Sequence, residues 1–151
     1  MTSSWLLFFK DMQKRILSID YGERRVGLAI TDPSGIVASP LTTLSVHSTD
    51  GVILAIVNLI KELSVTRVVI GLPKLLSGLE GDKAAKVRKM AEQISNATGI
   101  DCLFWDERFS SASAKRMLLE SETKRSRRTK EKLDALAATV ILNDYLKSQT
   151  S

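Results

Sequence analysis

The fold is decided by residues 15–31, which read Arg15-Ile-Leu-Ser-Ile-Asp20-Tyr-Gly-Glu-Arg-Arg-Val-Gly-Leu-Ala-Ile-Thr31. An apolar run that ends in Asp20 is followed by the turn residues Tyr21 to Arg24, and a second apolar run extends from Val26 to Ile30. This pattern predicts a β-hairpin with a carboxylate at the end of its first strand. A strand fixes such a carboxylate in place while the turn leaves it open to a substrate, so Asp20 is a candidate site residue.

The chain continues from this hairpin into a third predicted strand. The segment Thr31-Asp-Pro-Ser-Gly35 holds Asp, Pro and Gly at positions that a type I turn prefers. The extended pattern resumes over residues 36–41, and Pro40, which has no backbone N–H to donate, places this strand at an edge of the sheet. The first three elements are therefore predicted to form an antiparallel meander.

The rest of the chain alternates helical and extended patterns. Apolar residues that recur every three and four positions predict a helix over residues 50–63, which Asp50 can cap. The further elements expected are a strand over 66–73, a helix over 83–97 stopped by Gly99, a strand over 100–105, a short helix from Ser110 or Ser111 to Glu120, an exposed basic loop over 121–132 and a last helix over 133–146. This order, βββαβαβαα, predicts an α/β fold whose five-stranded mixed sheet, three antiparallel strands followed by two parallel ones, is flanked by helices.

Length and composition fit a single domain. The 151 residues are enough for one core, and we expect the domain to span residues 15–147. Residues 1–14 are expected to be an N-terminal extension that either packs on the domain or is disordered, and residues 148–151 a C-terminal tail. The lone Cys102 excludes a disulfide framework and predicts a reducing cytoplasm.

The charge balance favours an anionic partner. The chain has 22 Lys and Arg against 17 Asp and Glu, which gives a net charge of +5. Nucleic acid is the leading class of partner and a membrane surface a distant second. The candidate nucleic-acid-binding residues are Arg24, Arg25, Arg108, Arg125, Arg127, Arg128 and Lys130.

Acidic residues stand out at the ends of two predicted strands and in the last helix. Asp20 ends the first strand, Asp106 and Glu107 end the last strand, and Asp134 is predicted to lie in the first turn of the final helix. If the two strands run the same way, their carboxyl ends share one rim of the sheet, where ligands of open α/β sheets bind. Converging carboxylates suit Mg²⁺ or Mn²⁺, which can activate a water and stabilise the leaving oxygen in phosphodiester hydrolysis.

Each of these acids also has a plain structural interpretation. Asp20 could be a turn or cap residue, Asp106 and Glu107 could form a surface ion pair with Arg108, and Asp134 could favour a helix N-terminus through its charge. The basic run before Asp134 would ordinarily be a solvated loop, although beside bound metal ions it would supply phosphate-binding cations.

A series of short motifs occurs in one order along the chain. It comprises Ile19-Asp-Tyr-Gly22, Val26-Gly-Leu-Ala-Ile30, Asp32-Pro33, Val69-Ile-Gly-Leu-Pro73, Gly78-Leu-Glu-Gly81, Asp106-Glu-Arg108, Ser126-Arg127 and Asp134-Ala-Leu-Ala-Ala138. In these motifs the sequence resembles the YqgF-like nuclease family, whose members are also described as Holliday junction resolvases. The resemblance implies an RNase H-like fold, a bacterial cytoplasmic protein, and processing of the 5′ end of precursor 16S ribosomal RNA.

The resemblance also implies which residues act. Asp20, Glu107 and Asp134 match the family's acidic positions, which implies that they are the catalytic residues and bind Mg²⁺ or Mn²⁺. Whether Asp106 or Glu107 points inward stays open, since neighbours on a strand face opposite ways. The implied partners are precursor ribosomal RNA or branched DNA and the ribosomal particle, with the chain a monomer or a weak homodimer and no membrane involved.

Other classes of function share parts of this pattern. Sugar kinases and actin-like ATPases place Asp-x-Gly in the same hairpin, but they need a duplicated domain to close over a nucleotide and this chain is too short. A nucleic-acid or ribosome-assembly binder without catalysis also fits, and metal-dependent cleavage that disappears in Asp20→Asn would exclude it. Between RNA processing and junction resolution the sequence does not choose.

Overall fold

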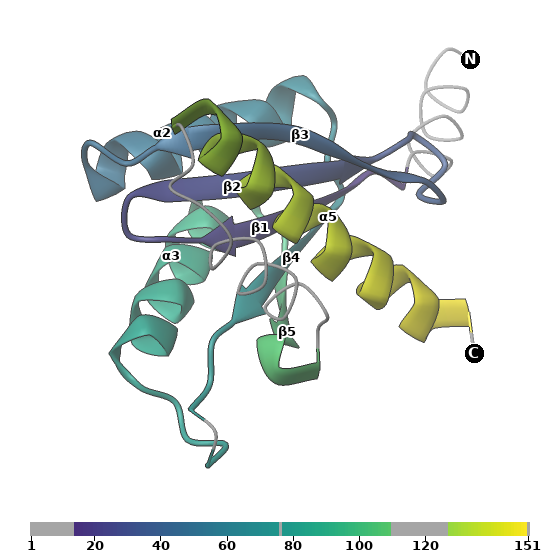
Figure 1. Cartoon of the computed structure of the whole chain (residues 1–151). Coiled ribbons are helices and arrows are strands. Elements are labelled where there is room, and N and C mark those ends of the chain that lie inside the picture. Colours follow the sequence, from purple (N-terminus) through teal and green to yellow (C-terminus); the bar gives the residue numbers. More distant parts are fainter. Residues whose placement is uncertain (1–13, 76, 110–126, 151) are drawn as a thin grey trace.

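The computed structural model of the chain describes residues 14–75, 77–109 and 127–150 (Figure 1). Its strands form one mixed sheet in the order β3-β2-β1-β4-β5. They are β1 (Ile16–Tyr21), β2 (Arg25–Thr31), β3 (Ala38–Ser45), β4 (Arg67–Leu72) and β5 (Cys102–Asp106). The pairs β1–β2 and β2–β3 are antiparallel, whereas β1–β4 and β4–β5 are parallel. The predicted mixed sheet is confirmed, as is the edge position that Pro40 indicated for β3.

Helices cover both faces of this sheet (Figure 1). α2 (Thr49–Glu62) and α3 (Asp82–Thr98) pack on one face, and α5 (Arg127–Thr150) crosses the other. A short 3-10 helix, η1 (Glu107–Phe109), follows β5. The predicted helix over 110–120 lies outside the described residues. Within the described ranges, no helix combines the length and the apolar character needed to cross a bilayer.

The ends of the two helices on the first face show one correct and one wrong prediction. Gly99 ends α3 in the left-handed conformation with φ of 74°, as its sequence position indicated. The predicted cap of α2 is wrong, because its N-cap is Ser48, whose Oγ accepts a hydrogen bond from the Gly51 amide at 3.1 Å. Asp50 lies in the first turn, where its charge favours the helix N-terminus.

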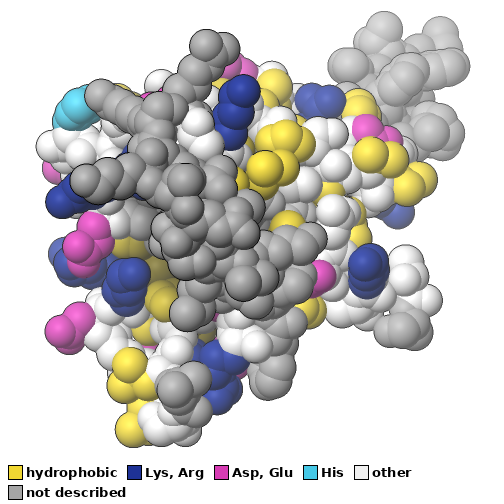
Figure 2. All heavy atoms as spheres, in the orientation of Figure 1, with side chains coloured by type: hydrophobic (Ala, Val, Ile, Leu, Met, Phe, Trp, Pro, Cys, Tyr) yellow, Lys and Arg dark blue, Asp and Glu magenta, His cyan; other side chains and the backbone are white. Residues whose placement is uncertain are grey.

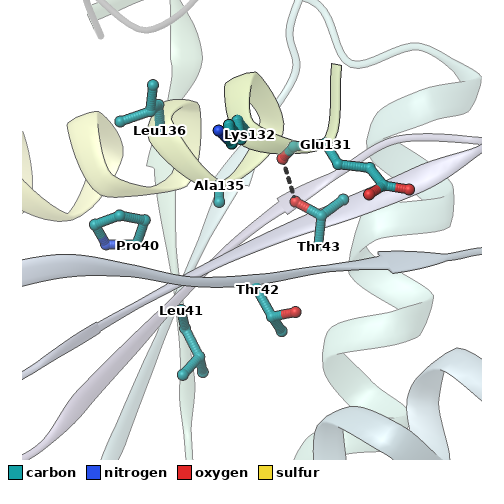
Figure 3. Close-up of a pocket in the computed structure, with 8 residues that line it drawn as sticks. All are labelled: Pro40, Leu41, Thr42, Thr43, Glu131, Lys132, Ala135 and Leu136. Atoms are coloured by element: carbon teal, nitrogen blue, oxygen red, sulfur yellow. Dashed lines mark hydrogen bonds between the residues drawn. The ribbon is translucent and has the colours of Figure 1, made fainter. Parts of the chain in front are cut away.

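The last helix begins earlier and ends later than its apolar pattern predicted. It starts at Arg127, so residues 127–132 are helical and not an exposed loop, and it continues to Thr150. Arg and Lys are good helix formers, and the edge strand holds these turns in place. Thr43 Oγ1 donates a hydrogen bond to the Glu131 carbonyl at 2.5 Å. Figure 3 shows Thr43 pointing from β3 toward α5 across a pocket lined by both elements, while Leu41 points away from the helix.

Each face of the sheet has its own hydrophobic core. Leu17, Ile19 and Leu28 face α2 and α3 and belong to the larger core. The smaller core packs Ile16 and Ala29, among others, against α5. This division follows from the alternation of side chains along a strand, which turns neighbouring residues to opposite faces.

Polar contacts fix α5 along its length. Ser18 Oγ donates to the Ala138 carbonyl at 2.5 Å, which ties the middle of the helix to β1. Nearer its C-terminus, Arg67 Nη1 donates to the Tyr145 hydroxyl at 2.9 Å. The Tyr145 ring also meets the Trp105 ring edge to face, with centroids 6.3 Å apart. The helix therefore has one defined position over the sheet.

Candidate active site

Asp20 lies near the end of β1 on the face that α5 covers. Alternate residues of a strand face the same way, and Ser18, two residues earlier, hydrogen-bonds to α5. Asp20 is only 4% exposed. Gly27 lies directly opposite it in β2, and on the other side the β1–β4 register, continued by one residue, brings Gly71 beside it. Asp20 is therefore flanked by a glycine on each neighbouring strand.

The first of these glycines lets the backbone of α5 lie directly on the sheet. A Cβ atom at Gly27 would be 2.1 Å from the carbonyl oxygen of Asp134 and 3.0 Å from the amide nitrogen of Ala135. A side chain at this position would require the α5 backbone to shift. The close approach places Asp134 next to the strand position that pairs with Asp20.

The second glycine makes room for Glu107. A Cβ atom at Gly71 would be 2.6 Å from Glu107 Oε1 and 3.0 Å from Ile141 Cδ1, an atom of α5. The Glu107 carboxylate therefore lies over Gly71 on the α5 face. The structure thus brings Asp20, Glu107 and Asp134, from β1, η1 and α5, to one face and one rim of the sheet.

Burial shapes the ionisation of Glu107. Removal of the carboxylate from water raises its pKa, and the charge of Asp106 adds to the rise. The ammonium group of Lys83, in the first turn of α3, opposes it. A neighbouring cation stabilises the charged form of such a carboxylate and so lowers its pKa.

The question left open between Asp106 and Glu107 is resolved by their directions. Asp106 accepts hydrogen bonds from the Arg108 side chain, at 2.8 Å to Nη2, and from the Arg108 amide at 3.0 Å. Its Oδ2 also lies 3.6 Å from Lys74 Nζ. Chiefly through the Arg108 hydrogen bond, these contacts hold the pKa of Asp106 below its ordinary value. Asp106 therefore forms the ion pair that the sequence allowed, and Glu107 faces α5.

Asp134 is well inside α5 and is held by an arginine. The prediction that it lies in the first turn is wrong because the helix starts at Arg127, so its charge does not serve the helix N-terminus. Its Oδ2 accepts a hydrogen bond from Arg25 Nε at 2.6 Å. The two side chains are 14% and 24% exposed, respectively, so this ion pair is partly shielded from water.

The candidate nucleic-acid-binding cations lie in different settings. Arg24 and Lys130 are exposed, Arg25 is paired with Asp134, and Arg108 is paired with Asp106. Arg125 and the side chains of Arg127 and Arg128 lie outside the description. On the face seen in Figure 2, the visible Lys and Arg side chains lie at several separate places, some beside acidic ones.

The three carboxylates fit a divalent cation in their chemistry. Asp20, Glu107 and Asp134 supply hard oxygen ligands of the kind that Mg²⁺ and Mn²⁺ prefer. Among the described residues, no three acidic, histidine or cysteine side chains lie close enough together to form a ready-made metal cluster. Mg²⁺ commonly takes one or two carboxylates and completes its shell with waters and substrate phosphates. The residue types therefore suit a divalent cation, although the described side chains form no preformed site for one.

The two glycines and Lys83 belong to the site but were not identified from the sequence. A glycine inside an apolar strand often marks the close approach of another chain segment, and both Val26-Gly27-Leu28 and Ile70-Gly71-Leu72 show that signal. The position of Lys83 depends on how α3 is placed beside η1, which no local pattern reveals.

The sequence matches known proteins over most of its length. Residues 14–148 match the model of the RuvX family, described as Holliday junction resolvase. The "Putative pre-16S rRNA nuclease" of Chloroflexus aurantiacus is 40% identical over 136 residues, which cover 90% of this chain and 88% of the relative. The protein of the same name from Desulforudis audaxviator is 39% identical over 137 residues, covering 91% and 96%.

Solved structures give the same fold at much lower identity. RuvC of Thermus thermophilus, in complex with a Holliday junction substrate, superposes with a TM-score of 0.58 at 12% identity and covers 91% of this chain and 98% of its own. A second structure of Thermus thermophilus RuvC gives a TM-score of 0.56, also at 12% identity. At this identity the likeness concerns the fold, and it agrees with the predicted RNase H-like architecture.

Proposed function

The chain belongs to the RuvX family of Holliday junction resolvases, and from this membership we propose that it is a metal-dependent nuclease that processes the 5′ end of precursor 16S ribosomal RNA. The substrate follows the name of the curated relatives, which share about 40% of their residues with this chain. We further propose that it acts in the bacterial cytoplasm on RNA within the ribosomal particle, as a monomer or a weak homodimer.

The observation that supports this proposal is the position of three acidic residues around two glycines. Asp20 lies between Gly27 and Gly71, the Asp134 backbone lies on Gly27, and the Glu107 carboxylate lies on Gly71. Carboxylates held on three separate elements keep their spacing only if those elements are fixed, and α5 is tied to the sheet by side-chain hydrogen bonds. A fixed acidic rim of this kind suits phosphodiester hydrolysis.

Asp20, Glu107 and Asp134 are the residues proposed to hold Mg²⁺ or Mn²⁺. The bound ion would lower the pKa of an attacking water and stabilise the charge that develops on the phosphate. The raised pKa of Glu107 is reversed by a nearby cation, so the carboxylate and the ion would favour each other's binding.

Arg25 is proposed to position both a carboxylate and the substrate. Its Nε donates to Asp134, and its Nη groups form no hydrogen bond with any residue that the structure describes. A guanidinium fixed at one edge can present its remaining N–H groups to a phosphate, which binds such a fork in two places. Arg24 and Lys130, which are both exposed, are proposed to contact more distant phosphates.

Resolution of four-way DNA junctions is the second candidate function. It is favoured by the description of the family model and by the shared fold of RuvC, which was solved with such a junction. The same three carboxylates would serve either reaction, because both break a phosphodiester bond. The two functions differ in the shape of the nucleic acid and not in the chemistry.

The test compares substrates directly. Purified full-length chain with Mn²⁺ or Mg²⁺ is offered a precursor 16S RNA fragment, an unrelated single-stranded RNA and a four-way DNA junction. We expect cleavage of the precursor near its 5′ end, and loss of that cleavage in Asp20→Asn. Even the outer residues of a metal site are worth about 10–100-fold, so loss of a carboxylate ligand is expected to cost more than about 100-fold.

The matched control is Asp101→Asn. Asp101 is exposed and precedes β5, at the end of that strand away from Glu107, so this variant is expected to cleave like the wild type. Cleavage of the junction alone would support the second candidate. If the wild type and Asp20→Asn are equally inactive on all substrates and still bind RNA, the protein is a binding protein and not a nuclease.

A further inference from the structure

A second cavity lies across the strand end from Asp20. It has a volume of about 460 Å³ and is lined by β1, the β1–β2 turn, the start of α2 and the face of α3. Tyr21, the residue after Asp20, contributes to it from the opposite face of the sheet, since successive strand residues point to opposite sides. The cavity and Asp20 therefore lie at the same end of β1, on opposite faces of the sheet.

The lining of the cavity combines apolar side chains with polar and charged ones, of which Glu23 and Lys86 pair with each other. Tyr21, Val46 and Met90 supply aromatic, aliphatic and thioether surface. Tyr21 and Gln93 are only partly exposed, yet neither side chain hydrogen-bonds to a residue in the part of the chain that the structure describes. A flat aromatic face beside an amide that can both donate and accept is what a nucleobase requires for stacking and edge recognition.

Three lysines of α3 lie in a row that reaches the cavity. Lys83 is exposed in the first turn of the helix, and Lys86 and Lys89 line the cavity together with the acidic residues Glu23 and Asp50. Successive members are three residues apart, so each lies about one turn beyond the last on the helix surface. Among the residues that the structure describes, Lys86 pairs only with Glu23, in an exposed contact at 3.6 Å that a phosphate can readily replace. Arg88 differs, because its Nε and Nη2 both donate to the Glu80 carboxylate and its plane covers the Phe104 ring.

We infer that the cavity between Tyr21 and Gln93 holds one unpaired base of the substrate, next to the phosphodiester bond cleaved at Asp20. The lysine row carries the phosphates between the two places. The inference rests on the proposed function for the position of the cleaved bond. It adds a preference that the acidic rim cannot provide, because a base inside a duplex is stacked and paired and cannot enter the cavity.

Binding is tested without cleavage, in full-length Asp20→Asn protein. The probes are a short fluorescein-labelled single-stranded RNA and the same RNA with one abasic nucleotide placed at each position in turn. Stacking of a single base accounts for roughly tenfold or more in affinity, so we expect one position at which removal of the base weakens binding by about that factor. In Gln93→Leu and in Tyr21→Leu the difference between the intact and abasic RNA should largely disappear.

The matched control is Asn96→Leu, which removes an exposed amide from the same helix outside the cavity and should keep the full difference. A base dependence that is the same in Gln93→Leu as in the parent, or that occurs at no position, overturns the inference. Cleavage by the wild type is measured separately with the same RNA. If cleavage fails while the Gln93-dependent base effect persists, the nuclease proposal is wrong and the cavity assignment stands. If cleavage is intact and the base effect is absent, the nuclease proposal stands and the cavity assignment is wrong.

Discussion

The two faces of the sheet are built from different kinds of residue. On the α2 and α3 face, Leu17, Ile19 and Leu28 are large and completely buried. On the α5 face, Gly27 and Ala29 occupy the neighbouring positions of β2. Strand β2 thus presents large side chains to α2 and α3, and very small ones to α5 at Gly27 and Ala29.

This difference separates stability from site geometry. Large aliphatic side chains stabilise the fold by roughly 1.5–3 kcal/mol each when they are fully buried. Small residues contribute little burial, but they allow a helix backbone to come close enough to place Asp134 beside the strand that carries Asp20. Substitutions on the two faces of β2 should therefore have separable effects on unfolding and on cleavage.

Leu28→Ala should have the largest effect on stability. Leu28 is completely buried on the α2 and α3 face, and truncation of such a residue costs about 2–5 kcal/mol. Urea unfolding followed by circular dichroism measures the loss. Cleavage per folded molecule should stay near the wild-type value, because the α5 face is unchanged. If cleavage is lost in the absence of urea, at a temperature where the variant is fully folded, the two faces are not independent.

Gly27→Ala should have a smaller effect on stability and a larger one on activity. Its new methyl group would lie 2.1 Å from the Asp134 carbonyl oxygen, a backbone atom that cannot rotate away. Forced overpacking of this kind costs about 1–3 kcal/mol. Because α5 must shift to relieve the contact, Asp134 moves from its place and cleavage should fall by about tenfold or more, since a misplacement of about 1 Å can cost 100-fold.

Gly71→Ala is compared with Gly27→Ala, because the glycine in the first case faces a side chain and in the second a helix backbone. Its methyl group would meet Glu107 Oε1 at 2.6 Å, the free end of a side chain that can rotate. The unfolding free energy should therefore fall less than in Gly27→Ala, while cleavage still decreases because the carboxylate is displaced. Equal stability losses in the two variants would contradict this account of what lies above each glycine.

The sequence was most informative where local pattern and position decide the structure. Two apolar runs on either side of the turn residues 21–24 predicted the hairpin, and the parallel strand order placed Asp20 and Glu107 at a common rim. The choice between Asp106 and Glu107 was not accessible, because the chain leaves β5 at Asp106 and turns into η1, where strand alternation no longer applies.

The start of α5 was missed for a different reason. Residues 127–132 have no apolar period, and their helical state depends on the edge strand, where Thr43 bonds to the Glu131 carbonyl. That contact joins residues far apart in the sequence and leaves no local trace. The N-cap of α2 was missed because Ser48 and Asp50 are both suitable cap residues and only the backbone geometry distinguishes them.

The smallest effect is expected at the turn between β2 and β3, at the end of β2 that is remote from Asp20. Asp32 accepts hydrogen bonds from Ser34 Oγ and from the amides of Ile36 and Val37, the latter two at 2.9 and 2.8 Å. These bonds, that of Ser34 foremost, lower the pKa of Asp32 from 3.8 to about 2. Since the folded-state pKa is depressed, the ionised group stabilises the fold above pH 3.8, and this contribution is lost as the pH falls toward 2.

Asp32→Asn isolates this contribution, because its side-chain oxygen can still accept from the Ile36 and Val37 amides while it cannot titrate. Urea midpoints measured on both sides of the window from pH 3.8 to about 2 should fall less for Asp32→Asn than for the wild type. Cleavage at neutral pH should be unchanged in the variant, since neither face of the sheet at Asp20 is altered. A parallel decline of the two proteins through the window would show that the turn carboxylate ionises in the unfolded chain as it does in the folded one.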